Sequence, residues 1–171
     1  MKYRALIVDD ERIIVNGIMR LPIWLSLDIE PVPAMTGLQA LELMEQYRFD
    51  LIITDIRMPE MDGLEFISQM RKVYPDIPTV VLSGYDSFAY AKEAIAMGGF
   101  DYVLQPVRYE EVEAVLLKAW DNISSRKKLR RLENTRKLVI EQRNTILDAM
   151  LSKMTRDKGE EADQIYRHYV E

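Results

Sequence analysis

The chain has 171 residues, of which 48% are hydrophobic and 30% charged, enough for one buried core with an appendage rather than for two full domains. It has no cysteine and one histidine, His168, which excludes disulfides, thiolate metal sites and most histidine-based catalysis or zinc ligation. No stretch approaches the roughly 20 apolar residues of a membrane span, and the beginning, MKYRALIVDD, lacks the features of a signal peptide, so we expect a cytoplasmic protein.

The formal net charge of -5 divides unevenly along the chain. Residues 1–121 carry 11 Lys and Arg against 20 Asp and Glu, a net charge of -9, whereas residues 122–171 carry 12 against 8, a net charge of +4. Such an asymmetry indicates two physical roles. We therefore expect one domain over residues 1–124 and a helical extension over residues 125–171.

Within the first 121 residues, short apolar runs alternate with amphipathic patterns of helical period. The predicted strands are residues 5–8, 31–35, 51–54, 79–82 and 101–104, and the predicted helices are residues 12–19, 38–47, 64–73, 88–97 and 109–120. Five such units predict an α/β fold, a doubly wound, flavodoxin-like parallel sheet covered on both faces. Pro31 and Pro33 cannot donate ladder hydrogen bonds, which puts the second strand at an edge and fits the strand order 2-1-3-4-5.

In such a sheet the functional site lies beyond the carboxyl ends of the strands. The residues at those ends are Asp9, Asp10 and Glu11, then Asp55, then Ser83 and Gly84, and finally Gln105 and Pro106. The carboxylates of Asp9, Asp10 and Asp55 would repel one another without a cation, and an all-oxygen ligand set suits Mg2+. With Mg2+ bound, one Asp could attack a phosphoryl donor and hold an aspartyl phosphate, to which a Ser hydroxyl could donate.

A purely structural role is the alternative to each of these assignments. A single Asp after a strand is more often a helix cap or a turn former, and Asp9 or Asp10 can serve in that way too. Carboxylates at two separate strand ends, with a hydroxyl at a third, are not explained by capping alone. The combined pattern therefore favours a phosphate site.

Four segments carry a pattern whose order and spacing are specific: LIVDDE (6–11), DLIITDIRMPEMDGLEF (50–66), VVLSGYDSFAYAKEAI (80–95) and GGFDYVLQPV (98–107). They resemble the response regulator receiver domain of two-component signalling, over residues 2 to about 124. The resemblance implies the following roles: Asp55 as phosphoacceptor; Asp9 and Asp10 as Mg2+ ligands together with Asp55 and the Ile56 carbonyl; Ser83 and Tyr102 as the hydroxyl and the aromatic of the switch. It also implies a sensor histidine kinase as partner and a cis bond before Pro106, and it matches Pro59 and Gly63 to the loop after the acceptor.

One position departs from the family pattern. The residue before Pro106 is a Lys in the family, and in this chain it is Gln105. A neutral amide offers a phosphate a hydrogen bond without the positive charge of an ammonium. Metal binding should survive this replacement, whereas phosphoryl transfer and its linkage to Ser83 and Tyr102 are placed in question.

Three classes of function follow from these features. The first is a phosphorylatable receiver, and the second is a pseudo-receiver, an interaction module with weak or absent phosphate switching. The third, a Mg2+-dependent aspartyl-phosphate phosphatase, is disfavoured because such hydrolases need a second Asp where Arg57 stands. We therefore expect a signalling domain and not an enzyme.

Residues 125–171 contain no Pro, one Gly and many helix formers, which predicts a helix to about Met154. Leu132, Val139 and Ile146 recur every seven residues, but their companion positions are mostly polar, so a coiled coil is one possibility among others. We expect a homodimer through this helix. The basic run 126–131 is more often a solvated face than a contact with nucleic acid. The segment SGYDSFAYAKEAI is similar to the corresponding segment of receivers that precede AraC-type DNA-binding domains. This resemblance implies DNA contact only through an output domain outside this chain.

Overall fold

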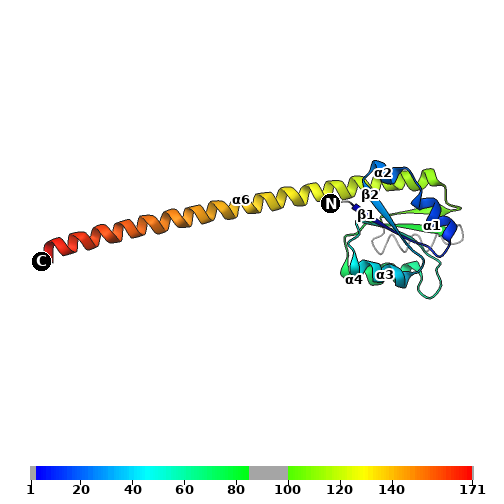
Figure 1. Cartoon of the computed structure of the whole chain (residues 1–171), viewed down its shortest axis with the longest axis horizontal. Coiled ribbons are helices and arrows are strands. Elements are labelled where there is room, and N and C mark those ends of the chain that lie inside the picture. Colours follow the sequence, from blue (N-terminus) through cyan, green and yellow to red (C-terminus); the bar gives the residue numbers. More distant parts are fainter. Residues whose placement is uncertain (1–2, 85–99, 171) are drawn as a thin grey trace. The chain divides into compact units, whose positions relative to one another are not determined.

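The computed structural model describes residues 3–84 and 100–170 of the chain. The chain divides into two compact units, Met1–Ser124 and Ser125–Glu171. In the first unit, the strands are β1 (Tyr3–Val8), β2 (Ile29–Ala34), β3 (Leu51–Asp55), β4 (Thr79–Gly84) and β5 (Asp101–Gln105) (Figure 1). All neighbouring strands pair in parallel, in the order β2-β1-β3-β4-β5. The predicted fold class and strand order are confirmed.

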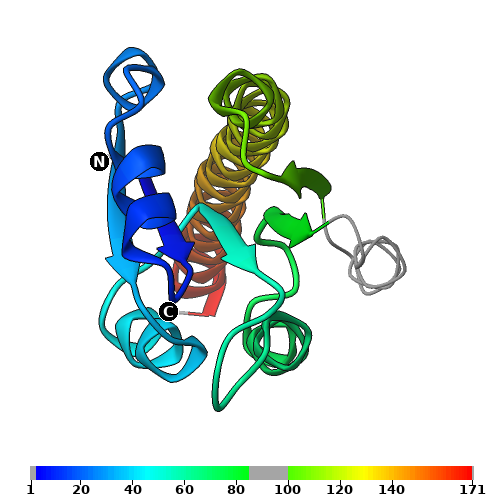
Figure 2. The ribbon, with the colours of Figure 1, turned by 90° about the vertical axis from the view of Figure 1, so that its right-hand side faces the viewer.

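The sheet buries both of its faces, which explains why its strands are continuous apolar runs. One face packs against α1 (Arg12–Met19), α2 (Ile23–Ser26) and the beginning of α6 (Tyr109–Val170). The other face packs against α3 (Gly37–Gln46) and α4 (Gly63–Val73), which Figure 2 shows together on one side of the sheet. The predicted helix over residues 88–97 lies outside the described residues.

The edge position of β2 has a visible cause in its two prolines. Tyr3 N donates to Asp28 O and Asp9 N donates to Ala34 O, at 3.3 and 3.2 Å, so the even-numbered residues of this segment face β1. Because successive residues of a strand point their polar groups to opposite sides, Pro31 and Pro33 face outward. Their missing N–H groups remove donors from the free edge and cost no ladder hydrogen bond.

Several boundaries differ from the sequence prediction. β2 runs from Ile29 to Ala34 rather than over residues 31–35, and β3, β4 and β5 each extend past their apolar runs into the polar residues of the rim. The short helix α2 was not predicted; it buries Trp24, whose Nε1 donates to Ile18 O at 2.6 Å. Four residues are too few to show a helical period.

The predicted end of the last helix was too early, because α6 continues to Val170. Its single Gly159 costs only about 1 kcal/mol relative to Ala and is followed by good helix formers, so it does not end the helix. No helix in residues 3–84 and 100–170 is both long and apolar enough to cross a membrane.

Candidate functional site

The carboxyl ends of β1, β3, β4 and β5 lie at the same end of the parallel sheet and bring the predicted site residues together. Asp9 follows β1 directly, Asp55 is the last residue of β3, and Gln105 is the last residue of β5. The β4–β5 register places Gly84 opposite Gln105, and Ser83 precedes Gly84 on β4. Residues that are 50 apart in the sequence, Asp55 and Gln105, therefore share a hydrogen bond.

Asp55 is held by two donors. Its Oδ2 accepts from the backbone N–H of Arg57 at 2.9 Å, and its Oδ1 accepts from Nε2 of Gln105 at 3.0 Å. The residue is only 7% exposed. Burial raises the pKa of Asp55 to about 6, helped by the negative charges of Asp10 and Glu11 and opposed by backbone N–H groups of Ile56 and Arg57. The carboxylate is thus fixed in orientation and is ionised mainly above pH 6.

Asp9 is the most deeply buried carboxylate of the site, at 1% exposure. Its Oδ1 accepts from Glu11 N at 2.7 Å, whereas its Oδ2 is buried without a hydrogen-bond partner. Burial raises the pKa of Asp9 to about 7, the Glu11 N–H lowers it, and the charge of Asp55 raises it further. Asp10, the next residue, is exposed.

These carboxylates fit a Mg2+ ion. A buried carboxylate oxygen without a donor is costly, and a cation would both satisfy Asp9 Oδ2 and offset the repulsion from Asp10 and Asp55. No group of three or more acidic or histidine side chains in the described part of the chain is arranged to hold a metal by itself. Mg2+ does not need such a cage, because it usually keeps several waters and takes one or two carboxylates.

The Ile56 carbonyl, a ligand implied by the resemblance, already has a partner. Its oxygen accepts from the N–H of Gly63 at 2.8 Å, a bond that ties the end of β3 to the start of α4. Gly63 is required there, since a Cβ would lie 2.0 Å from the carbonyl oxygen of Asp55. Asp62 caps the same helix by accepting from Glu65 N at 2.8 Å. The second lone pair of the Ile56 carbonyl oxygen would still be available to a metal.

Ser83 and Tyr102, the expected switch residues, lie on β4, which pairs with β3, and on β5, which pairs with β4. Ser83 is fully buried, and its Oγ donates to the carbonyl of Gly84 at 3.3 Å. Tyr102 is half-buried and packs with the hydrophobic cluster on the α3 and α4 face of the sheet. The bond between Gln105 and Pro106 is cis, as the resemblance implies.

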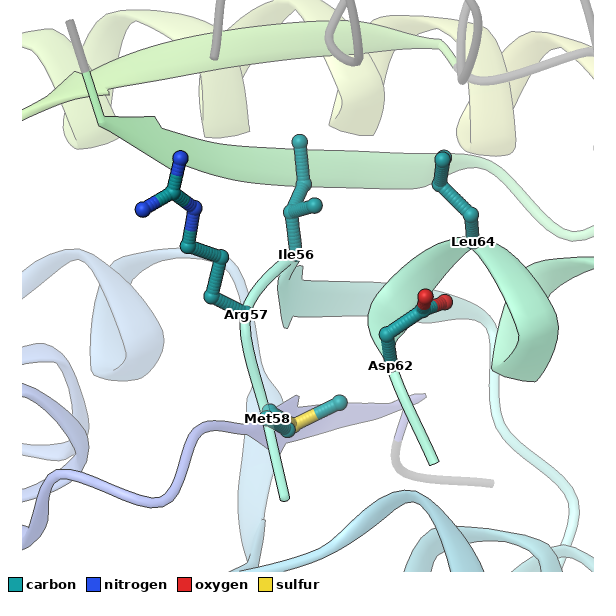
Figure 3. Close-up of a pocket in the computed structure, with 5 residues that line it drawn as sticks. All are labelled: Ile56, Arg57, Met58, Asp62 and Leu64. Carbon is teal, nitrogen blue, oxygen red and sulfur yellow. The ribbon is translucent and has the colours of Figure 1, made fainter. Parts of the chain in front are cut away.

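A pocket of about 460 Å³ lies beside the acceptor, in the loop between β3 and α4. It is lined by Ile56, Arg57, Met58, Asp62 and Leu64, and Asp55 itself does not line it. Figure 3 shows the side chains of Ile56, Arg57 and Leu64 pointing to the same side of this loop. From the sequence, Arg57 served only as an argument against a phosphatase. Its position two residues after Asp55 is the signal that could have identified it as part of the site.

Residues 5–117 match the family model described as the response regulator receiver domain. The chain belongs to the response regulator receiver family. That membership places it among the signalling modules of two-component systems. The fold, the strand order and the acidic residues at the carboxyl ends of the strands are all consistent with this membership.

Known proteins similar to this receiver include transcriptional regulators. It is 39% identical over 111 residues to the uncharacterized transcriptional regulatory protein YesN of Bacillus subtilis, covering 64% of this chain and 30% of YesN. It is 35% identical over 115 residues to the transcriptional regulatory protein HptR of Staphylococcus aureus, covering 67% of this chain and 45% of HptR. The chain thus spans less than half of these relatives. The REC domain of the response regulator AraT from Geobacillus stearothermophilus has a TM-score of 0.70 and 36% identity, covering 74% of this chain and 99% of that domain.

Proposed function

We propose that this receiver accepts a phosphoryl group on Asp55 from a sensor histidine kinase, in a Mg2+-dependent reaction, and thereby controls an attached output. The observation that carries the proposal is the environment of Asp55. Its carboxylate is buried at the C-terminal end of β3 and accepts a hydrogen bond through each of its two oxygens. Two further acidic residues, Asp10 and Glu11, are close enough to raise its pKa. A carboxylate whose pKa is raised by burial and by neighbouring charges is a candidate for a functional role.

The reaction asks three things of the chain's own residues. A lone pair on a carboxylate oxygen of Asp55 attacks the phosphorus of the kinase's phosphohistidine, the P–N bond breaks, and its electron pair returns to the imidazole nitrogen, which takes up a proton. The N–H donors of Arg57 and Gln105 hold the nucleophile in place. Asp9, Asp10 and Asp55 would hold Mg2+, which would offset the charge of these carboxylates and of the phosphoryl oxygens.

The output that we propose is transcription in the cytoplasm. The support is the wording of the relatives' names, because YesN and HptR are transcriptional regulatory proteins that extend well beyond the receiver. DNA would then be contacted by an output domain and not by residues 1–171. We further propose that α6 mediates a homodimer, since Leu132, Val139 and Ile146 recur every seven residues and are all more than half exposed.

The test is phosphorylation by a small donor. The native chain incubated with acetyl phosphate and Mg2+ should gain the mass of one phosphoryl group, and the gain should be absent after EDTA or in Asp55→Asn. Asp76→Asn is a matched control, since Asp76 is exposed in the loop before β4, at the end of the sheet opposite to Asp55. A native chain that gains no more than Asp55→Asn would instead support the pseudo-receiver, in which Gln105 has ended phosphate switching.

A further inference from the structure

The phosphorylated site would have an unbalanced charge. A phosphoryl group adds close to two negative charges at pH 7, beside the carboxylates of Asp9 and Asp10. The side chain that touches Asp55 from β5 is the neutral amide of Gln105. The amide can donate to a phosphoryl oxygen but adds no positive charge to the site, so a second cation near the acceptor would matter more in this chain than where a Lys is present.

Arg57 is placed to be that cation. Its backbone N–H is fixed on Asp55 Oδ2 at 2.9 Å, which holds its Cα next to the acceptor in every variant that keeps the loop. Its side chain is exposed and lines the pocket beside the acceptor. No hydrogen bond or ion pair ties its guanidinium down within the described residues, in contrast to Arg4 and Arg108, which are paired with Glu30 and Glu111.

The chemistry of the side chain suits the task. A guanidinium stays charged at any relevant pH and presents a planar fork of donors that matches two phosphoryl oxygens. The long stem of Arg57 can span the short distance from its Cα to oxygens just beyond the Asp55 carboxylate. The pocket of about 460 Å³ that Arg57 lines leaves its exposed side chain, drawn in Figure 3, room to change conformation.

We propose that Arg57 binds the phosphoryl group on Asp55 and supplies the positive charge that Gln105 lacks. This inference rests on the proposed phosphorylation of Asp55 and adds to it the residue that stabilises the product. Its distinctive consequence is redundancy: a cation at position 57 and a cation at position 105 should substitute for one another. The effect of removing Arg57 therefore depends on which residue stands at position 105.

The experiment is a double-mutant cycle over Arg57→Gln and Gln105→Lys, with the affinity for beryllofluoride in the presence of Mg2+ as the readout. We expect Arg57→Gln to weaken beryllofluoride binding about tenfold in the native background, the loss of one charge-assisted hydrogen bond, and less than about twofold in the Gln105→Lys background. Arg48→Gln, which removes an exposed Arg from the loop before β3, is the control and should leave the affinity unchanged. Urea unfolding should show that all the variants remain folded.

A second readout observes the residue directly. In NMR spectra, the side-chain Nε–H signal of Arg57 should sharpen and shift on addition of beryllofluoride, and that of Arg48 should not. Equal losses from Arg57→Gln in both backgrounds, or no loss in either, would overturn the role of Arg57 while phosphorylation of Asp55 stands. A native chain that neither binds beryllofluoride nor gains a phosphoryl group would overturn the proposed function, and this inference with it.

Discussion

Gln105 reaches across from the end of β5 to donate its side-chain amide to Oδ1 of Asp55, at 3.0 Å. The amide preserves the contact between the last residue of β5 and the acceptor but carries no charge. Asp55 is therefore positioned as an acceptor with a pKa of about 6, raised mainly by burial. The predictions for metal binding and phosphorylation follow from this combination of a well-oriented carboxylate and little positive charge around it.

Restoring the charge should strengthen the response to phosphate. In Gln105→Lys, an ammonium replaces the amide beside the phosphoryl oxygens, and the two-state equilibrium should shift by about tenfold toward the active form. The same ammonium should compete with Mg2+ in the unphosphorylated protein. NMR of Ser83 and Tyr102 with and without beryllofluoride measures the shift, and Gln46→Lys on the exposed end of α3 is the control for added charge. If the native chain already switches as fully as Gln105→Lys, Gln105 is a tolerated replacement.

Stability should fall as the pH rises from about 4 to 7 in the absence of metal. The pKa of Asp9 is raised from its usual 3.8 to about 7, so the folded state binds more protons than the unfolded state between these values. The ionised carboxylate then costs the folded state on the order of 4 kcal/mol above pH 7. Asp9→Asn should accordingly be more stable than the native chain at pH 8 and about equal to it at pH 4.

Urea unfolding in EDTA at several pH values measures this difference between native and Asp9→Asn protein. An asparagine keeps an acceptor for Glu11 N–H, so the comparison isolates the charge. Mg2+ should shrink the difference at pH 8, because a bound cation offsets the carboxylate. A difference between the two proteins that does not change with pH would show that Asp9 does not titrate as its burial implies.

The fold was predictable because its determinants are local and repeated. All-apolar strands of four residues separated by amphipathic helices define a covered parallel sheet, and Pro31 and Pro33, which lack N–H donors, identify the edge strand. The cluster of acidic residues was predictable for the same reason, because polar residues that follow buried parallel strands must meet at one end of the sheet. Gln105 was recognisable only by its departure from the family pattern.

Other features depend on tertiary contacts that leave no pattern in the sequence. The unpartnered Oδ2 of Asp9 and the Gln105–Asp55 hydrogen bond exist only once β1, β3 and β5 are assembled. The use of the Ile56 carbonyl by Gly63 likewise comes from the return of the chain into α4. The continuation of α6 past Met154 shows that a single Gly is a weak stop signal in a long run of helix formers.

Magnesium binding should depend on the carboxylates and should survive without a Lys at position 105. Calorimetric titration of the native chain should give an ordinary receiver response, which Asp10→Ala and Asp55→Asn weaken. Because the pKa of Asp9 is about 7, binding at pH 6 should release protons and be weaker than at pH 8. Asp76→Asn should bind as the native chain does. Unchanged heats in Asp10→Ala and Asp55→Asn would remove Mg2+ from the site.

The extension after Ser124 should hold the dimer that we propose. Truncation at Ser124 should leave a folded monomer, and sedimentation should show the full chain at twice its monomer mass. The double variant Leu132→Ser and Val139→Ser should also dissociate, since these side chains repeat on one stripe of α6. Leu138→Ser is the matched control, because Leu138 is 60% exposed but lies about 100° around the helix from Val139. Equal masses with and without the extension would refute this role.

The most direct measurement is chemical identification of the phosphorylated atom. An aspartyl phosphate is an acyl phosphate, which borohydride reduces to the alcohol, so a phosphorylated Asp55 becomes homoserine at position 55. The native chain should be incubated with Mg2+ and a phosphorylated histidine kinase domain or acetyl phosphate, reduced, digested and sequenced by mass spectrometry. We predict homoserine at position 55, dependent on Mg2+ and more abundant in native protein than in Arg57→Gln. Homoserine at another Asp, or at none under conditions that modify a control receiver, would contradict the assignment of Asp55 as the phosphoacceptor.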